Sequence, residues 1–228
     1  MNNSVIIAED HPLFRAALQA AVSQAMDSKP EVTEADTIDS LQDALERNSN
    51  PNLVLLDLNM PGAHGFSGLL YVRGQHPKVP VVVISAQDDE SVIRRALSYG
   101  AAGFIPKSSS MPVIKAALQG VMRGENWIPP NIDMSREVEL GKSNLEEKIS
   151  SLTPQQFRVL GMIGEGMLNK QIAWELNISE ATIKAHVTAI FRKLGVRNRT
   201  QAVIALKQLE LDEPNSSKDS ENPSLSAE

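Results

Sequence analysis

Short apolar runs alternate with helical periodicity along the first 124 residues of the chain. The runs expected to form strands are Ser4–Ala8, Glu31–Ala35, Asn52–Pro61, Val79–Ala86 and Ala102–Ile105. Between them, apolar residues recur at spacings of three and four, which predicts helices beginning near Pro12, Thr37, Gly68, Asp88 and Met111. Strands that alternate with helices in this way predict an α/β fold with a doubly wound, parallel, five-stranded sheet.

The pattern changes after Gly124 and predicts a second domain. Residues 125–150 are polar and weakly periodic, which is typical of a linker. The stretch from Thr153 to Gln156 reads Thr-Pro-Gln-Gln, a capping box that begins a small all-α domain over residues 151–211. Four helices are expected there, near Pro154–Glu165, Asn169–Leu176, Ser179–Leu194 and Arg199–Leu209. Residues 212–228 are rich in Ser, Asn, Pro and acids, so we expect an acidic, disordered tail.

The composition excludes several classes of site, and the charged residues are unevenly distributed along the chain. The chain has no cysteine, so disulfides and thiolate chemistry are excluded. Its start lacks the pattern of a secretory signal and no apolar run is long enough to span a bilayer, so we expect a cytoplasmic protein with no membrane partner. The net charge is −6, but residues 151–208 carry +5 and are the one basic block. Local charge decides attraction to a phosphate backbone, so this block is the candidate for nucleic-acid binding.

Polar residues collect where the predicted strands end. Glu9 and Asp10 follow the first strand, Asp57 ends the third, Ser85 ends the fourth, and Lys107 follows the fifth. The carboxyl ends of parallel strands meet at one edge of a sheet, where α/β folds bind their ligands. Carboxylates that converge there favour Mg²⁺, which prefers oxygen ligands. With a hydroxyl and an ammonium, they are the groups that an acyl-phosphate site requires.

Residues 4–123 resemble the receiver domain of two-component response regulators, whose sheet is flavodoxin-like. The resemblance rests on Glu9-Asp10, Asp57-Leu-Asn-Met-Pro61, Ser85-Ala86 and Gly103-Phe-Ile-Pro-Lys107. It implies that Asp57 is the phosphoacceptor, and that Glu9, Asp10, Asp57 and the main-chain carbonyl of Asn59 hold Mg²⁺. It further implies that Lys107 and Ser85 bind the phosphoryl group and that Phe104 is the switch aromatic. The first acid is Glu rather than the commoner Asp, and Ser108 replaces the usual proline after Lys107.

The histidines have a weaker case for function. His11 stands beside Pro12 at a helix start, which favours a surface or capping residue over the alternative of a phosphorylated histidine. His64 and His76 fall in expected loops and suggest no role.

The third helix of the basic domain has the character of a DNA-recognition helix. In Ser179–Leu194 the apolar residues form one stripe, and the opposite face carries small and basic side chains. A short turn at Asn177-Ile178 joins this helix to the preceding one. A small, basic face suits the major groove, where bulky side chains would hold a helix away from the bases.

Residues 152–205 resemble the LuxR-type helix-turn-helix of NarL/FixJ response regulators, through Asn169-Lys-Gln-Ile-Ala173, Thr182-Ile-Lys-Ala-His-Val187 and Lys193-Leu-Gly-Val196. The resemblance implies base contacts from one turn of the recognition helix, phosphate contacts around it, and a dimer surface on the last helix. The DNA-binding residues expected on this basis are Lys170, Ser179, Thr182, Lys184, Ala185, Thr188, Arg192 and Lys193. The dimer residues expected are Thr200, Val203 and Ile204.

The two resemblances together predict a transcription regulator that a sensor histidine kinase switches by phosphorylating Asp57. It would bind double-stranded DNA as a homodimer, with no enzymatic activity beyond its own phosphorylation and dephosphorylation. We expect the unphosphorylated first domain to mask the Lys184 face. Two alternatives remain: a DNA-binding regulator whose first domain binds another ligand or protein, and a phosphorelay component whose second domain binds only protein.

Overall fold

The computed structural model describes residues 3–26, 28–130, 132 and 144–210. Its N-terminal domain contains strands β1 (Ser4–Ala8), β2 (Glu31–Ala35), β3 (Leu53–Asp57), β4 (Val81–Ser85) and β5 (Gly103–Pro106). They form one parallel sheet in the order β2-β1-β3-β4-β5, which confirms the predicted doubly wound fold. The order reverses between β1 and β3, so a crevice opens at their carboxyl ends.

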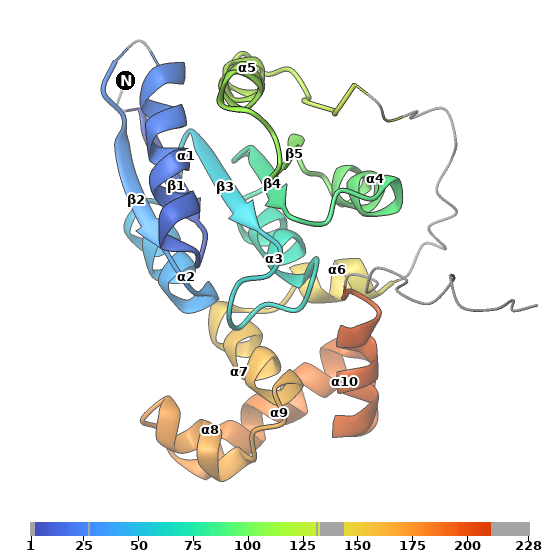
Figure 1. Cartoon of the computed structure of the whole chain (residues 1–228). Helices are drawn as coiled ribbons and strands as arrows, with labels where there is room; N and C mark the ends of the chain where they lie inside the picture. Colours follow the sequence, from blue (N-terminus) through green and yellow to red (C-terminus); the bar gives the residue numbers. More distant parts are fainter. Residues whose placement is uncertain (1–2, 27, 131, 133–143, 211–228) are drawn as a thin grey trace, which may run out of the picture.

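Helices cover both faces of this sheet (Figure 1). Helices α1 (Pro12–Ala25) and α5 (Met111–Met122) lie on one face, and α2 (Ile38–Arg47), α3 (Ser67–Gln75) and α4 (Glu90–Ser98) lie on the other. Side chains alternate along each strand, so Val5 and Ile7 pack with α1 and α5 whereas Ile6 packs with the opposite layer. The side chain of Thr37 caps α2 by accepting a hydrogen bond from the backbone N–H of Ser40 at 3.1 Å, as the sequence predicts.

The expected linker is partly helical, which corrects the sequence interpretation. Residues Leu145–Ser150 form helix α6, which packs against α3. Leu145 and Ile149 are buried, and the hydroxyl of Ser150 donates to the carbonyl of Leu70 at 3.0 Å. Two apolar residues at a spacing of four in a polar stretch were too few to reveal a helix that folds against a distant surface. Residues 133–143 of the linker and the tail 212–228 lie outside the described residues.

The C-terminal domain contains helices α7 (Pro154–Gly164), α8 (Asn169–Glu175), α9 (Glu180–Leu194) and α10 (Arg199–Lys207), as expected to within two residues. Thr153 and Gln156 form the predicted capping box at the start of α7. Gly195 ends α9 with φ of 70°, a left-handed conformation that glycine adopts without strain. No helix among the described residues is long and apolar enough to cross a membrane.

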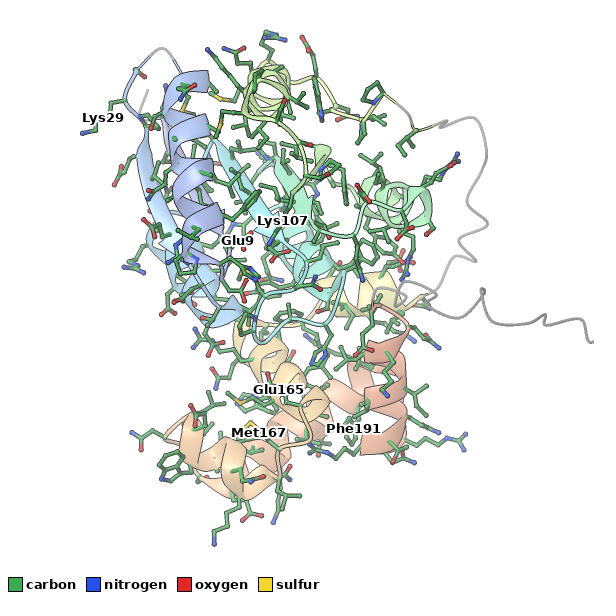
Figure 2. The ribbon with its side chains drawn as sticks, in the orientation of Figure 1. Glu9, Lys29, Lys107, Glu165, Met167 and Phe191 are labelled. Atoms are coloured by element: carbon green, nitrogen blue, oxygen red, sulfur yellow. The ribbon has the colours of Figure 1, made fainter. Side chains whose placement is uncertain are left out.

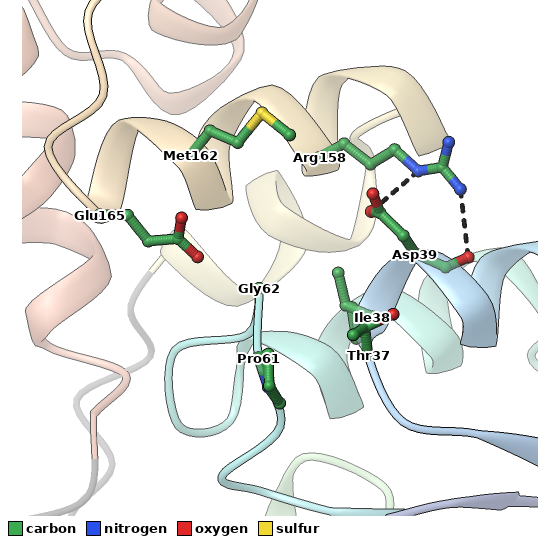
Figure 3. A pocket seen from close by; sticks show the side chains of 8 residues that line it. All are labelled: Thr37, Ile38, Asp39, Pro61, Gly62, Arg158, Met162 and Glu165. Atoms are coloured by element: carbon green, nitrogen blue, oxygen red, sulfur yellow. Dashed lines mark hydrogen bonds and ion pairs between the residues drawn. The ribbon is translucent and has the colours of Figure 1, made fainter. Parts of the chain in front are cut away.

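The two domains meet along a surface that we call the domain seam: α2, α3 and the loop 58–66 of the first domain against α6, α7 and the end of α10. Tyr71 stacks on Phe157 with ring centroids 4.4 Å apart. Figure 3 shows Arg158 of α7 reaching Asp39 of α2, with Nε 2.9 Å from the Asp39 Oδ1 atom, beside a cavity of about 170 Å³. The end of α10 also belongs to the seam, because the carbonyl of Leu209 accepts the backbone N–H of Phe66 at 2.9 Å.

Candidate functional site

The ends of β1, β3 and β5 bring three charged side chains of the predicted site into direct contact. The Lys107 ammonium lies 2.9 Å from Asp57 Oδ2 and 2.8 Å from Glu9 Oε2 (Figure 2 labels Glu9 and Lys107). Both carboxylates are buried, since Glu9 is 0% and Asp57 2% exposed. One cation thus bridges two buried anions that would otherwise repel each other.

A divalent cation fits the remaining negative charge. Ligand atoms of Glu9, Asp10, His11 and Asp57 lie within 4.8 Å of one another. Three carboxylates gather here and the Lys107 ammonium contacts two of them, so a compact dication would add to the neutralisation, and carboxylate oxygens suit Mg²⁺. The Asn59 backbone N–H donates to Asp57 Oδ1 at 3.2 Å and thereby orients the carboxylate.

Burial and charge set the titration of the central pair. Burial raises the pKa of Asp57, and the nearby Glu9 charge adds to this, while the hydrogen bond and the charge of Lys107 act in the opposite direction. Burial alone would lower the pKa of Lys107, but its hydrogen bonds to Glu9 and Asp57 raise it. The ammonium is therefore held firmly in its charged form beside the phosphoacceptor candidate.

Two other predicted residues lie around this pair. Ser85 is fully buried, and its hydroxyl accepts the backbone N–H of Gln87 at 3.1 Å, so it points along the loop after β4. Phe104 is fully buried in the core that faces α4. The hydroxyl of Ser85 is thus hydrogen-bonded to the loop after β4 rather than to Asp57, and Phe104 is part of the apolar core.

Two residues of the first helix region contact the acid pair. His11 is an exposed residue at the N-cap position of α1, which agrees with the expected surface or capping role, and its Nδ1 lies 2.8 Å from Glu9 Oε1 and 2.7 Å from Asp10 Oδ1. Arg15 donates to the Glu9 carbonyl at 2.7 Å and so fixes the backbone of the acid pair. The signal was present in the spacing: both residues fall within one or two helical turns of the acids and on the same chain segment.

The recognition surface on α9 is open to solvent. Lys184, Ala185, Thr188 and Arg192 are exposed and, with Ala189, line one shallow hollow. Helix α7 lies between this helix and the first domain (Figure 1). The expected masking of the Lys184 face is therefore wrong for this structure, because the first domain docks on α7 and α10 instead.

The other expected DNA contacts fall into two groups. Lys170 and Thr182 are exposed, whereas Ser179 caps α9 by accepting the Thr182 N–H at 3.0 Å. Lys193 is half-buried and its ammonium donates to the carbonyl of Ser151 at 2.6 Å, which ties α9 to the end of α6.

The expected dimer face of α10 is accessible. Thr200 and Ile204 are exposed, Val203 is half-buried, and Ala202 and Leu206 face the core. Ile204 is 53% exposed, so this face offers an apolar side chain that a partner could contact.

Comparison with known proteins identifies both domains. Residues 5–119 match the family described as "Response regulator receiver domain", and residues 150–206 match "Bacterial regulatory proteins, luxR family". The chain belongs to the response regulators of the NarL/FixJ class. It is 40% identical to the glycerol metabolism activator of Pseudomonas putida over 88% of this chain and 93% of that protein. It is 28% identical to the nitrate/nitrite response regulator protein NarL of Escherichia coli over 90% and 95% of the two chains.

Solved structures of a response regulator share the two-domain organisation. RcsB from Salmonella enterica serovar Typhimurium, bound to a promoter in the presence of the phosphomimetic BeF3⁻, matches with a TM-score of 0.53 and 25% identity over 92% of this chain and all of that one. A structure of two RcsB dimers bound to two parallel DNAs matches with a TM-score of 0.53 and 26% identity, over 92% of this chain and 98% of that one. This response regulator is accordingly a DNA-binding transcriptional regulator of a two-component system.

Proposed function

We propose that Asp57 is the phosphoacceptor of this response regulator and that a sensor histidine kinase is the donor. The observation that carries the proposal is the Lys107 ammonium, 2.9 Å from Asp57 Oδ2 at the carboxyl edge of the sheet. In the transfer, an Asp57 oxygen bonds to phosphorus while the bond from phosphorus to the kinase histidine breaks. The electron pair of that bond stays with the imidazole, which takes up a proton. Lys107 then neutralises charge on the phosphoryl oxygens.

Glu9, Asp10 and Asp57 are the residues that would hold Mg²⁺, together with the main-chain carbonyl of Asn59. When bound, the ion would supply a second positive charge for the phosphoryl oxygens. Arg15 and His11 keep the two acids in place from the side of α1. The receiver has no further catalytic apparatus in this proposal, so its chemistry is limited to its own phosphorylation and dephosphorylation.

An apolar recess beside the site supports docking of a kinase. Leu13 is 90% exposed at the start of α1, and it lines the recess with Phe14, Ala17, Ala86 and Lys107. An exposed leucine next to a phosphoacceptor gives a partner helix an apolar anchor within reach of Asp57.

On the DNA side, we infer that α9 enters the major groove with Lys184, Ala185 and Thr188 toward the bases. In this proposal Lys170, Thr182 and Arg192 contact the phosphates on either side, and Ile204 of α10 belongs to a homodimer contact. Such a regulator acts where the chromosome is, so we propose a cytoplasmic location.

Phosphorylation would act on the DNA-binding domain through the domain seam. The loop that leaves Asp57 ends at Phe66, whose backbone N–H donates to the carbonyl of Leu209 in the turn just after α10. Arg95 of α4 donates to the carbonyl of Gln208 at 2.8 Å and stacks over the Phe66 ring at 4.6 Å. The receiver thus holds the end of the proposed dimer helix while it leaves the recognition face free.

The first experiment is the intact mass of the wild-type protein and of Asp57→Asn after incubation with acetyl phosphate and Mg²⁺. One added phosphoryl group in the wild type and none in the variant would support the proposal. If the wild type gains nothing, or if Asp57→Asn binds DNA and responds to its signal as the wild type does, a regulator controlled by another ligand or protein is favoured. DNA binding that is absent or insensitive to salt would favour a phosphorelay component.

A further inference from the structure

The Lys107 ammonium has an aromatic neighbour in addition to its two carboxylates. The Phe14 ring centroid lies 5.2 Å from Nζ, within the range of cation–π attraction. Phe14 belongs to α1, one turn after the acid pair, and it is packed against the apolar cluster between the sheet and helices α1 and α5. Its ring thus has a fixed support on one side and the ammonium on the other.

The other two contacts of Lys107 must change during the proposed reaction. Glu9 shares its negative charge with the metal ion once that ion binds, and Asp57 becomes an acyl phosphate. Both events weaken the ion pairs that hold the ammonium now, at 2.8 and 2.9 Å. The Phe14 ring undergoes no chemical change, so its attraction for the ammonium persists through every step.

The site is also closed enough for this attraction to matter. The Lys107 side chain is 16% exposed, and the attraction of a cation for a ring face increases when water is removed. A lysine has four rotatable side-chain bonds, and holding its end in one place costs conformational entropy that the ring contact offsets.

We propose that Phe14 is a positioning residue that keeps the Lys107 ammonium beside Asp57 while the phosphoryl group is transferred. This inference rests on the proposed function of Asp57. It assigns to α1 a part in the chemistry of the site, in addition to its packing on the sheet.

The test compares two substitutions that separate the ring face from apolar volume. Phe14→Leu keeps the side chain apolar but removes the ring face, and Phe14→Tyr keeps the ring. The initial rate of phosphorylation by acetyl phosphate with Mg²⁺ is measured by intact mass, because a small donor needs no kinase docking surface. We expect Phe14→Leu to lower the rate about fivefold, which corresponds to about 1 kcal/mol, and Phe14→Tyr to stay within about twofold of the wild type.

A matched control distinguishes positioning from a general loosening of α1. Val22 is buried in the same cluster at the far end of the helix, so Val22→Ala weakens the packing of α1 without touching the site. We expect Val22→Ala to lower the melting temperature at least as much as Phe14→Leu and to leave the rate unchanged. A rate loss in Val22→Ala equal to that in Phe14→Leu, or an equal loss in Phe14→Tyr, would overturn the role of the ring.

The outcomes also separate this inference from the proposed function. A wild-type protein that gains no phosphoryl group would refute the function of Asp57 itself. A wild-type protein that is phosphorylated at the same rate as Phe14→Leu would refute only the inference about Phe14.

Discussion

The close approach of α7 to the loop after Asp57 allows the domain seam to be opened with one methyl group. Gly161 lies in the interior of α7, and a Cβ atom built on it would be 2.6 Å from the main-chain carbonyl oxygen of Gly62. That distance is too short for a real Cβ contact. A side-chain rotation cannot relieve it, because the Cβ is fixed to the helix backbone and the oxygen belongs to the main chain of Gly62. We therefore expect Gly161→Ala to separate the two domains.

Gly161→Ala changes two free energies: the stability of helix α7 and the free energy of docking between the two domains. Alanine is favoured over glycine in a helix interior by about 1 kcal/mol, and this gain applies whether the domains are docked or apart. Overpacking costs about 1–3 kcal/mol, and this cost arises only in the docked form. The docking equilibrium should accordingly shift toward separation by about 5- to 150-fold, while the DNA-binding domain itself becomes more stable.

Scattering and distance measurements check this expectation. The chain has no native cysteine, so labels can be placed on the exposed residues Lys78 and Gln201 of the two domains through introduced cysteines. Gly161→Ala should broaden the distance distribution between the labels and increase the radius of gyration, and the melting temperature of the DNA-binding domain should not fall. An unchanged distance distribution would refute the reasoning.

Gly164→Ala is the matched control for this experiment. A Cβ there would meet Nε2 of His64 at 2.3 Å, which is the far end of a flexible side chain and can move aside. We expect His64 to lose its 3.3 Å contact with the Gly161 carbonyl and the domains to remain docked. Separation as large as that in Gly161→Ala would show that the loop backbone is not the limiting contact.

Three further predictions follow from other contacts. Burial raises the pKa of Tyr71 to about 12, so the docked state holds the phenol proton more tightly and docking should weaken as the pH rises from about 10 toward that value. Phe157→Ala should lower the pKa of Tyr71 in an absorbance titration, and an unchanged pKa would contradict the assignment. Lys184→Gln should reduce affinity for operator DNA about tenfold in anisotropy measurements, whereas Lys193→Gln should mainly loosen the end of α6. A larger loss of affinity in Lys193→Gln than in Lys184→Gln would show that Lys193 is the more important DNA contact. Thr153→Ala removes the cap of α7 and should cost about 1 kcal/mol in denaturant unfolding, with no loss expected if the cap contributes nothing.

The acidic site could be predicted from the sequence because its residues directly follow the apolar runs that form the strands. Each strand is short, apolar and followed at once by the polar residue in question, as with Asp57 after Leu53–Leu56. Parallel strands place all such residues at one edge, so their convergence follows from topology alone. The pairing of Lys107 with both Glu9 and Asp57 adds only distances to that expectation.

The domain seam could not be predicted in the same way, because the residues that meet there are far apart in the sequence and belong to no recognisable motif. His64 and Gln75 were loop and helix-end residues with no apparent role, yet Gln75 donates to the carbonyls of Ser150 and Leu152 at 3.2 and 3.1 Å. The available signal was glycine inside helical stretches: Gly74 in α3, and Gly161 and Gly164 in α7. Glycines there cost stability and indicate that another backbone approaches closely.

The position of the seam also explains how a small chemical change can reach the second domain. Only the loop 58–66 separates Asp57 from the Phe66 N–H that binds Leu209, and the same loop presents Gly62 to α7. Coupling through such a contact needs no chain of intermediate residues, because one loop begins at Asp57, the proposed phosphoacceptor, and ends on Leu209, just after α10. A phosphoryl group that pulls this loop toward Lys107 would withdraw it from α7 and α10 together. Control would then fall on the pairing of two DNA-binding domains, since the recognition face of each is already exposed.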